Sequence, residues 1–312
     1  MPHTSGATAP PEGSAAVTTV GRPPAPVPPA KGRSFAPKAG KQLHAGPLTY
    51  TVLTVFTVVS LLPLVWTFVA SSRTNQRLSQ TPPPLWFGGN LFKNMETAWN
   101  QGGLGKAMLN SIIVAGSITV GTVLFSTIAG YAFAKLRFRG SRLLMLVTVG
   151  TMMVPPQLGI VPLYLWMADL HWSNQLQAVI LPTFVTAFGV FFMRQYLVQA
   201  LPTELIEAAR VDGASSIRTV WHVVFPAARP AMAVLGLLTF VMAWNDFLWP
   251  IIALNQENPT VQVALNQLGT GYIPDQSVIM AGALLGTLPL LVAFALFGKQ
   301  IVGGIMQGAV KG

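Results

Sequence analysis

The chain has 312 residues, of which 52% are hydrophobic and only 9% are charged, and it carries a net charge of +10 and no cysteine. A soluble domain carries charge on about a quarter of its residues, so this composition excludes an ordinary soluble protein, and the missing cysteine excludes disulfides and thiolate metal sites. The positive charge does not indicate nucleic acid binding, because the basic residues stand at the ends of apolar runs rather than in one patch.

Residues 1–46 are rich in Pro, Ala, Gly, Ser and Thr and lack the apolar run of a signal peptide. A segment of this composition buries too little apolar surface to offset the entropy of ordering it. We therefore predict a disordered tail over 1–46, followed by one membrane domain over 47–312.

The apolar residues of the membrane domain gather into stretches long enough to cross a hydrocarbon core about 30 Å thick. Lipid offers no partner for backbone N–H and C=O groups, so each stretch is predicted as an α-helix. Prolines within several stretches, among them Pro155 and Pro156, indicate kinks and favour a bundle that lines a cavity. The sequence thus predicts an all-α membrane protein with six transmembrane helices. Their expected bounds are 47–70, 107–134, 143–168, 176–194, 231–254 and 277–298.

The orientation follows from the basic residues, because cytoplasmic segments carry an excess of Lys and Arg. With six spans, 15 of the 19 basic residues fall on the side that holds both termini, and 4 fall on the other side. We therefore expect a multi-pass protein of a bacterial inner membrane with both termini and the 195–230 loop in the cytoplasm.

The 195–230 loop predicts a helical hairpin outside the bilayer. Pro202 suits the first turn of a helix, and TELIEAARV continues with good helix formers. Glu204 and Glu207 lie three residues apart on one face. A small apolar face is expected from Leu205, Ala208 and Ala209.

The turn of this hairpin is predicted at Asp212-Gly213, because glycine allows a positive φ. Asp212 is expected to cap a second helix that begins near Ser215 and ends at Pro226. From these residues alone, the hairpin is either an amphipathic element at the membrane surface or a docking site for a soluble partner.

The spacing of the loop resembles the EAA loop of bacterial ABC importer permeases. The matching positions are Glu207, Ala208, Ala209, Gly213, Val223, Phe225 and Pro226. Further stretches are similar to the maltose/oligosaccharide branch of carbohydrate-uptake permeases, specifically its six-span, MalG-like subunit. These are GYAFAKLRFRG (130–140), MMVPPQLGIVPLYLWMADL (152–170), LTFVMAWNDFLWP (238–250) and GGIMQGAVKG (303–312).

The resemblance implies an ABC importer in which the EAA helix enters a cleft of a cytoplasmic ATPase. Glu207 would make polar contacts there, Ala208 and Ala209 would allow close approach, and Gly213 would permit the turn. The implied partners are a second permease subunit (MalF-like), two copies of the ATPase subunit, an extracytoplasmic sugar-binding protein and membrane lipid. The chain lacks the phosphate-binding pattern G-x-x-x-x-G-K-S/T, so a separate ATPase is expected and the chain itself is not an enzyme.

The substrate-path candidates are Trp244, Asn245 and Asp246. Asp246 is the only acidic residue inside a predicted span, and such a carboxylate is a functional candidate. Asn245 could bind sugar hydroxyls and Trp244 could stack on a sugar ring. A structural role for Asp246, paired with a neighbouring helix or near the headgroups, is the competing interpretation.

Other function classes have less support in the sequence. No nucleophile–base arrangement and no metal-ligand spacing is evident, so we predict no catalytic residue, metal or cofactor. The alternative function is an ATP-independent secondary transporter or channel, which would need more ion-coupling charges within the membrane than one carboxylate. The transported molecule is predicted to be a sugar, with a neutral oligosaccharide favoured.

Overall fold

The computed structural model describes residues 46–270 and 274–309, so the predicted disordered tail lies outside the described residues except for Gly46. The contacts divide the chain between Thr54 and Val55. The architecture described below is that of the second unit, from Val55 onward.

All regular elements of the described residues are helical, and no strand occurs among them. The predicted all-α class is therefore confirmed for this part of the chain. In chain order the elements are α1 (Pro47–Ser71), α2 (Asn75–Leu78), α3 (Leu91–Gln101), α4 (Leu104–Lys135), α5 (Ser141–Thr151), η1 (Pro156–Gly159), α6 (Ile160–Asp169), α7 (Leu176–Ile180), η2 (Leu181–Thr183), α8 (Ala187–Ala200), α9 (Thr203–Val211), α10 (Ser216–Thr219), η3 (Val220–Val224), α11 (Phe225–Asn245), α12 (Leu248–Ala253), α13 (Val261–Leu268) and α14 (Gln276–Ala309).

Four helices are long and apolar enough to cross a membrane, and the number rises to six if each of two bent helix pairs counts as one span. The four are Pro47–Ser71, Leu104–Lys135, Ser216–Asn245 and Gln276–Gly298. The bent pairs are Ser141–Thr151 with Pro156–Asp169, at 92°, and Leu176–Thr183 with Ala187–Ala200, at 40°. Six spans therefore stay a prediction.

The predicted fifth span has the wrong bounds. We expected residues 231–254, but the helix begins at Ser216 and ends at Asn245, and α12 is a separate short helix. The break falls at Asp246, which has extended backbone angles.

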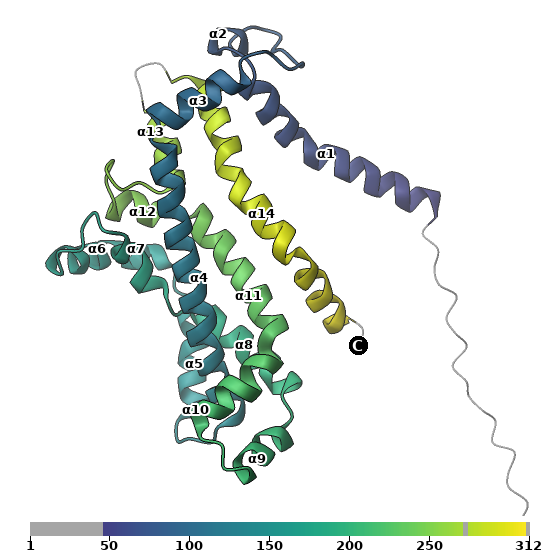
Figure 1. Cartoon of the computed structure of the whole chain (residues 1–312), viewed down its shortest axis with the longest axis vertical. Helices are drawn as coiled ribbons and strands as arrows, with labels where there is room; N and C mark the ends of the chain where they lie inside the picture. The colour runs from purple at the N-terminus through teal and green to yellow at the C-terminus, as the bar shows by residue number, and fades with distance from the viewer. Residues whose placement is uncertain (1–45, 271–273, 310–312) are drawn as a thin grey trace, which may run out of the picture. The chain divides into compact units, whose positions relative to one another are not determined.

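The long helix α4 packs most extensively against α8 and α11, and α11 also packs against α14 (Figure 1). Glycines bring α4 and α8 close together. A Cβ atom at Gly130 of α4 would lie 2.8 Å from the Cβ of Met193 in α8, and one at Gly189 of α8 would lie 2.4 Å from Ser126 Oγ in α4. Real side chains do not tolerate such distances, so these glycines fix the two helices against each other.

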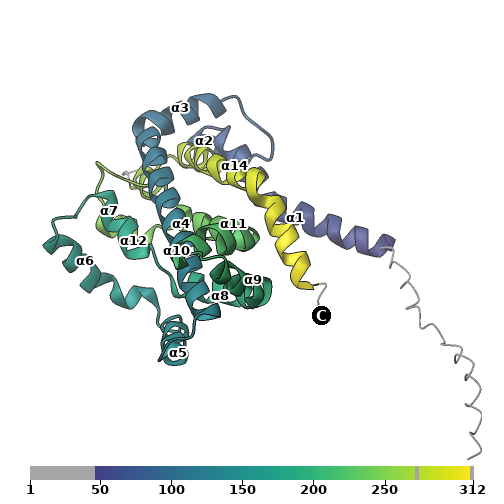
Figure 2. The ribbon, with the colours of Figure 1, turned by 60° about the horizontal axis from the view of Figure 1, so that its bottom comes forward.

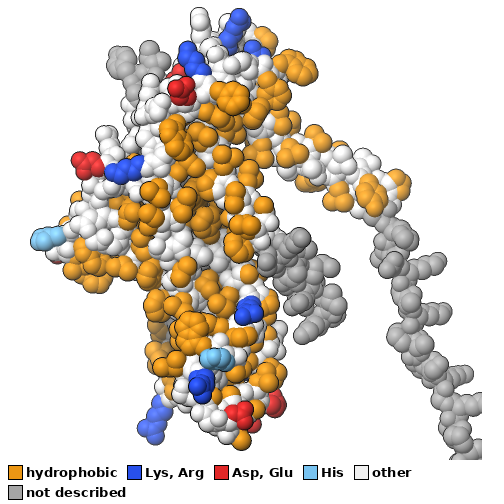
Figure 3. All heavy atoms as spheres, viewed as in Figure 1, with side chains coloured by type: hydrophobic (Ala, Val, Ile, Leu, Met, Phe, Trp, Pro, Cys, Tyr) orange, Lys and Arg blue, Asp and Glu red, His pale blue; other side chains and the backbone are white. Residues whose placement is uncertain are grey.

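Hydrophobic side chains cover the middle of the bundle on the face in Figure 3, whereas most Lys, Arg, Asp and Glu side chains gather toward its ends. At one end lie α2, α3 and α13, and at the other end lies α9 beside α10 (Figure 1). Figure 2 brings this second end forward. This distribution of charge is the one expected when lipid surrounds the middle of a helical bundle.

Candidate functional site

The predicted hairpin is formed by α9, a turn at Gly213, and the helical run that begins with α10. Pro202 precedes the first helical residue, where its missing N–H costs no hydrogen bond. Gly213 has φ +74, the left-handed conformation that glycine adopts most readily. The N–H of Gly213 donates to Arg210 O at 3.0 Å, and the N–H of Ala214 donates to Ala209 O at 2.9 Å. These bonds satisfy the last carbonyls of α9 and hold the turn in one shape.

The capping expectation for Asp212 is wrong. Asp212 is exposed and ends α9, whereas Ser215 caps the next helix. Ser215 Oγ accepts the N–H of Arg218 at 3.3 Å. Ser215 directly precedes α10, which places its hydroxyl within reach of the free N–H groups of the first turn. Asp212 lies three residues before Ser215, the capping position of α10.

The expectation that the second helix ends at Pro226 is also wrong. The run α10, η3 and α11 is one continuous helix of 30 residues from Ser216 to Asn245. The segment η3 is a π-helical turn in which the N–H of Phe225 donates to Val220 O, five residues earlier. This wider turn accommodates Pro226, which has no N–H and would clash with a carbonyl in a regular α-helix.

The helix α9 has one outward face and one inward residue. Glu204, Glu207, Ala208 and Asp212 are exposed, and Ala209 is partly buried. Val211 is 87% exposed, which is a large cost for an aliphatic side chain in water. The outer surface of α9 therefore combines carboxylates, a small residue and an exposed valine.

Ile206 is the buried residue of α9, with 3% of its surface exposed. It belongs to a core cluster drawn from α4, α8 and α11, which connects the hairpin to the membrane helices. The other members are Tyr131, Met193, Leu197, Leu201, Val224, Ala228, Ala231 and Leu235. We expected Leu205, Ala208 and Ala209 to form a small apolar face that is exposed for docking, and Leu205 and Ala208 are exposed while Ala209 is partly buried. The burial of Ile206 is a feature that the sequence analysis missed, and its signal is a large β-branched residue in the middle of α9.

Trp244 lies in the core, contrary to the expectation that it could stack on a sugar. It is 1% exposed, its Nε1–H donates to Gly286 O at 3.1 Å, and its ring stacks on Phe240 with centroids 5.7 Å apart. No face of the indole is open to a ligand in this conformation. Trp244 therefore joins α11 to α14.

Asn245 and Asp246 stand where α11 ends. Asn245 is exposed, and its Nδ2 donates to Val241 O at 2.8 Å, which leaves its side-chain oxygen available. Asp246 faces the backbone N–H groups at the start of the next short helix, those of Phe247, Leu248 and Trp249. The carboxylate thus lies at the N-terminal end of α12, which favours the structural interpretation of Asp246.

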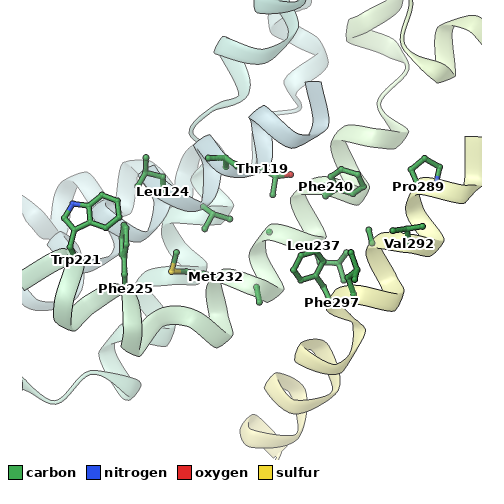
Figure 4. A pocket seen from close by; sticks show the side chains of 16 residues that line it. Thr119, Leu124, Trp221, Phe225, Met232, Leu237, Phe240, Pro289, Val292 and Phe297 are labelled. Carbon is green, nitrogen blue, oxygen red and sulfur yellow. The ribbon is translucent and has the colours of Figure 1, made fainter. Parts of the chain in front are cut away.

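A groove of about 690 Å³ runs between α4, α11 and α14 (Figure 4). Its lining includes Trp221, Phe225, Phe240 and Phe297, and Thr119 contributes a hydroxyl that already donates to Ala115 O at 2.6 Å. A sugar site needs convergent hydrogen-bonding groups, so this apolar groove is not suited to one. Among the described residues, no cluster of His, Asp or Glu side chains could hold a metal ion.

The helical architecture and the apolar spans are those of a multi-pass membrane protein. Residues 123–305 match the family described as the binding-protein-dependent transport system inner membrane component. Since this match covers more than half of the chain, the chain belongs to that family of ABC transporter inner-membrane permeases.

Relatives extend the similarity over most of the chain. It is 31% identical to the lactose transport system permease protein LacG of Rhizobium radiobacter, covering 84% of this chain and 95% of the relative. It is also 31% identical to the arabinooligosaccharides transport system permease protein AraQ of Halalkalibacterium halodurans, covering 81% and 92%. Identity to the sn-glycerol-3-phosphate transport system permease protein UgpE of Salmonella typhi is 33%, covering 83% and 95%.

A solved structure confirms the fold. The chain resembles a crystal structure of a bacterial ABC transporter involved in the import of the acidic polysaccharide alginate, with a TM-score of 0.71 and 22% identity. The similarity covers 81% of this chain and 94% of the other. The chain therefore has the fold of an ABC importer permease.

Proposed function

We propose that this chain is the membrane-spanning permease subunit of a binding-protein-dependent ABC importer that moves a neutral oligosaccharide, with ATP hydrolysed by separate subunits. The observation that carries this proposal is the hairpin around α9. Its outer face is exposed and uncovered, while Ile206 ties its inner side to three membrane helices. Such an element transmits force from a soluble partner to a bundle.

The outer face of α9 is the proposed ATPase contact. Glu207 supplies a carboxylate, and Ala208 leaves room for a partner to approach the backbone closely. A partner that covers Val211 would bind more tightly, because burial of a fully exposed aliphatic side chain stabilises a complex by about 1.5–3 kcal/mol. Arg210 and Asp212 add charges at the edge of this surface. At an edge, charges contribute more to the orientation of the bound partner than to the affinity of the complex.

Movement of the hairpin would reach the far end of the bundle through one helix. The run from Ser216 to Asn245 has 30 residues, so it is about 45 Å long. Val224 and Ala228 of this run pack in the same cluster as Ile206. When α9 shifts, the helix shifts with it, and Asn245 and Asp246 move at the opposite end.

The proposed complex contains a second, MalF-like permease chain, two copies of a cytoplasmic ATPase and an extracytoplasmic binding protein. Both termini and the hairpin lie in the cytoplasm, as the bias of basic residues predicts. The exposed apolar surfaces of α5 and α14 would then face lipid or the second permease.

The cargo is proposed to be a neutral saccharide. Two relatives are named for lactose and arabinooligosaccharides, and others for sn-glycerol 3-phosphate. A phosphate group needs Arg or Lys partners, and the interiors of the predicted spans provide none. The absence of such a cation favours the neutral cargo.

Site-specific crosslinking tests the ATPase contact. The chain contains no cysteine, so Glu207→Cys and Ala208→Cys each introduce a single thiol. In the co-expressed complex, a thiol-to-amine crosslinker at either position should capture the ATPase chain. Ile206→Cys is the matched control, because this neighbouring side chain is buried and should not crosslink. Capture of no nucleotide-binding chain at 207 and 208 would contradict the proposal, and so would their labelling from outside the cell.

A further inference from the structure

The backbone between α5 and α6 is interrupted in the middle of an apolar segment. The two helices meet at 92°, and the four residues after Thr151 belong to no helix. Pro155 and Pro156 follow one another here, and neither has an N–H to donate. The interruption is therefore built into the sequence.

Several backbone groups at this interruption have no hydrogen-bond partner among the described residues. No donor reaches the carbonyls of Met152, Met153 and Val154, and the N–H of Gln157 reaches no acceptor. In a regular helix, the N–H of residue 156 would pair with the carbonyl of Met152, but Pro156 removes it. The side-chain amide of Gln157 is likewise exposed and unpaired within the described part of the chain. Hydrogen-bond acceptors and donors without a partner in the described part of the chain are thus concentrated within residues 152–157.

If α5 crosses the bilayer from its basic end, these groups lie near the middle of the membrane. The helix α5 begins at Ser141, inside the basic run 135–142, and has 11 residues, so the interruption lies about 16 Å along it. This is about half of a hydrocarbon core of about 30 Å. The side chains here are uncovered, with Met153 86% exposed and Val154 56% exposed.

Lipid cannot surround this interruption. Irregular backbone at membrane depth is tolerated only where it is buried in protein or lines a water-filled cavity. Each unsatisfied group would otherwise cost several kcal/mol. The interruption must therefore face water or a polar ligand, or be covered by another chain.

We propose that the interruption at residues 152–157 lines the sugar path and binds the hydroxyl groups of a neutral saccharide. This inference rests on the proposed function. The free carbonyls of Met152, Met153 and Val154 accept hydrogen bonds from sugar hydroxyls, and the N–H and amide of Gln157 donate to sugar oxygens. A cluster of carbonyl oxygens repels a phosphate, so this surface selects neutral saccharides over sugar phosphates.

Cysteine labelling with a sugar-sized reagent tests this site. Met153→Cys would be the chain's single thiol, and its thiolate would attack glucosyl methanethiosulfonate to form a mixed disulfide that carries a neutral sugar, releasing methanesulfinate. The complex is labelled in membrane vesicles permeabilised so that both faces meet the reagent. Leu291→Cys is the control, because this residue is also exposed, at 58% against 86% for Met153, but lies within the continuous helix α14. We expect position 153 to label about tenfold faster or more, because lipid excludes a polar reagent.

Three outcomes would overturn the inference. No reaction at position 153 means that lipid or the partner permease covers it. Reaction with a small charged methanethiosulfonate but not with the glucosyl reagent means that the opening is too narrow for a sugar. Equal reaction at positions 153 and 291 means that the interruption has no special access to water.

A second variant tests whether the broken backbone is responsible. Pro155→Ala with Pro156→Ala returns two N–H donors, which can pair with the carbonyls of Thr151 and Met152. In this background, labelling at position 153 should fall toward the rate at position 291, and unchanged labelling would contradict the proposal. The Ala208→Cys crosslink to the ATPase separates the two proposals: if it persists while labelling fails, only the sugar site is wrong.

Discussion

Prolines are accommodated in this chain in two different ways, at Pro226 and at Pro155-Pro156. Pro226 follows a π-helical turn, and the helix continues through it for another nineteen residues, to Asn245. Before Pro155-Pro156, helix α5 ends at Thr151, the next helix runs at 92° to it, and three carbonyls have no partner among the described residues. The first arrangement keeps a long helix intact, as force transmission requires. The second exposes polar backbone groups, which the proposed sugar path would use.

The largest expected effect is at the turn that holds the hairpin. Gly213→Asp places a side chain at φ +74, which costs about 1–2 kcal/mol, and adds a carboxylate beside Asp212. We expect ATP-dependent uptake to be abolished while the protein still inserts in the membrane. Ala208→Glu, which fills the docking face, should have the same effect.

Uptake of radiolabelled lactose, arabinotriose and sn-glycerol 3-phosphate checks this prediction, together with the amount of permease in the membrane fraction. Ser216→Asp is the control, because it adds the same charge to an exposed residue at a helix start, where a carboxylate is tolerated. Normal uptake by Gly213→Asp would refute the role assigned to the hairpin.

A smaller effect is expected at the inner side of α9. Ile206→Ala removes a buried side chain from the cluster that joins the hairpin to α4, α8 and α11, which costs about 2–5 kcal/mol locally. The ATPase should still bind, but ATP hydrolysis should become poorly coupled to transport. The measurement is the number of sugar molecules moved per ATP hydrolysed. Leu205→Ala, at a half-exposed neighbour, should leave this ratio unchanged.

Pro226→Ala tests whether the proline that follows the π-helical turn maintains that turn. The new N–H can donate to the carbonyl of His222, so the π-helical turn can relax to a regular α-helix. That change rotates the hairpin relative to α11, and we expect a partial loss of uptake, smaller than for Ile206→Ala. Amide hydrogen exchange over residues 216–230 reports the change in helix hydrogen bonding. An unchanged exchange pattern would show that Pro226 does not maintain the turn.

The smallest effect is expected at Trp244. Trp244→Phe keeps the aromatic packing against Phe240 but removes the hydrogen bond to Gly286 O, which is worth about 1 kcal/mol. We expect a slightly lower melting temperature of the purified complex and unchanged selectivity among the three cargoes. A changed selectivity would indicate that Trp244 contacts the substrate.

The features that the sequence predicted well depend on local chemistry. Apolar length predicted helices such as α4, and glycine at position 213 predicted a turn with positive φ. The features that it missed depend on three-dimensional neighbours. Residues Leu205 and Ile206 are adjacent and both apolar, and only the packing of α8 and α11 decides which one is buried.

The same reasoning explains the errors at Pro226 and Trp244. A proline ends a helix or is accommodated by a wider turn, and the sequence does not reveal whether the preceding residues form that turn. A tryptophan beside polar residues is equally typical of a sugar-binding site and of a buried position where the indole N–H makes a hydrogen bond. The carbonyl of Gly286, which accepts this bond, lies 42 residues later in the chain, in a different helix.

The unbroken helix from Ser216 to Asn245 converts a small angle into a large displacement. If the hairpin end were held and the helix tilted by about 10°, the tip near Asn245 would travel about 8 Å, which is more than the ~5.4 Å height of one helical turn. A modest rotation imposed by the proposed ATPase partner would therefore be enough to open or shut the opposite end of the bundle.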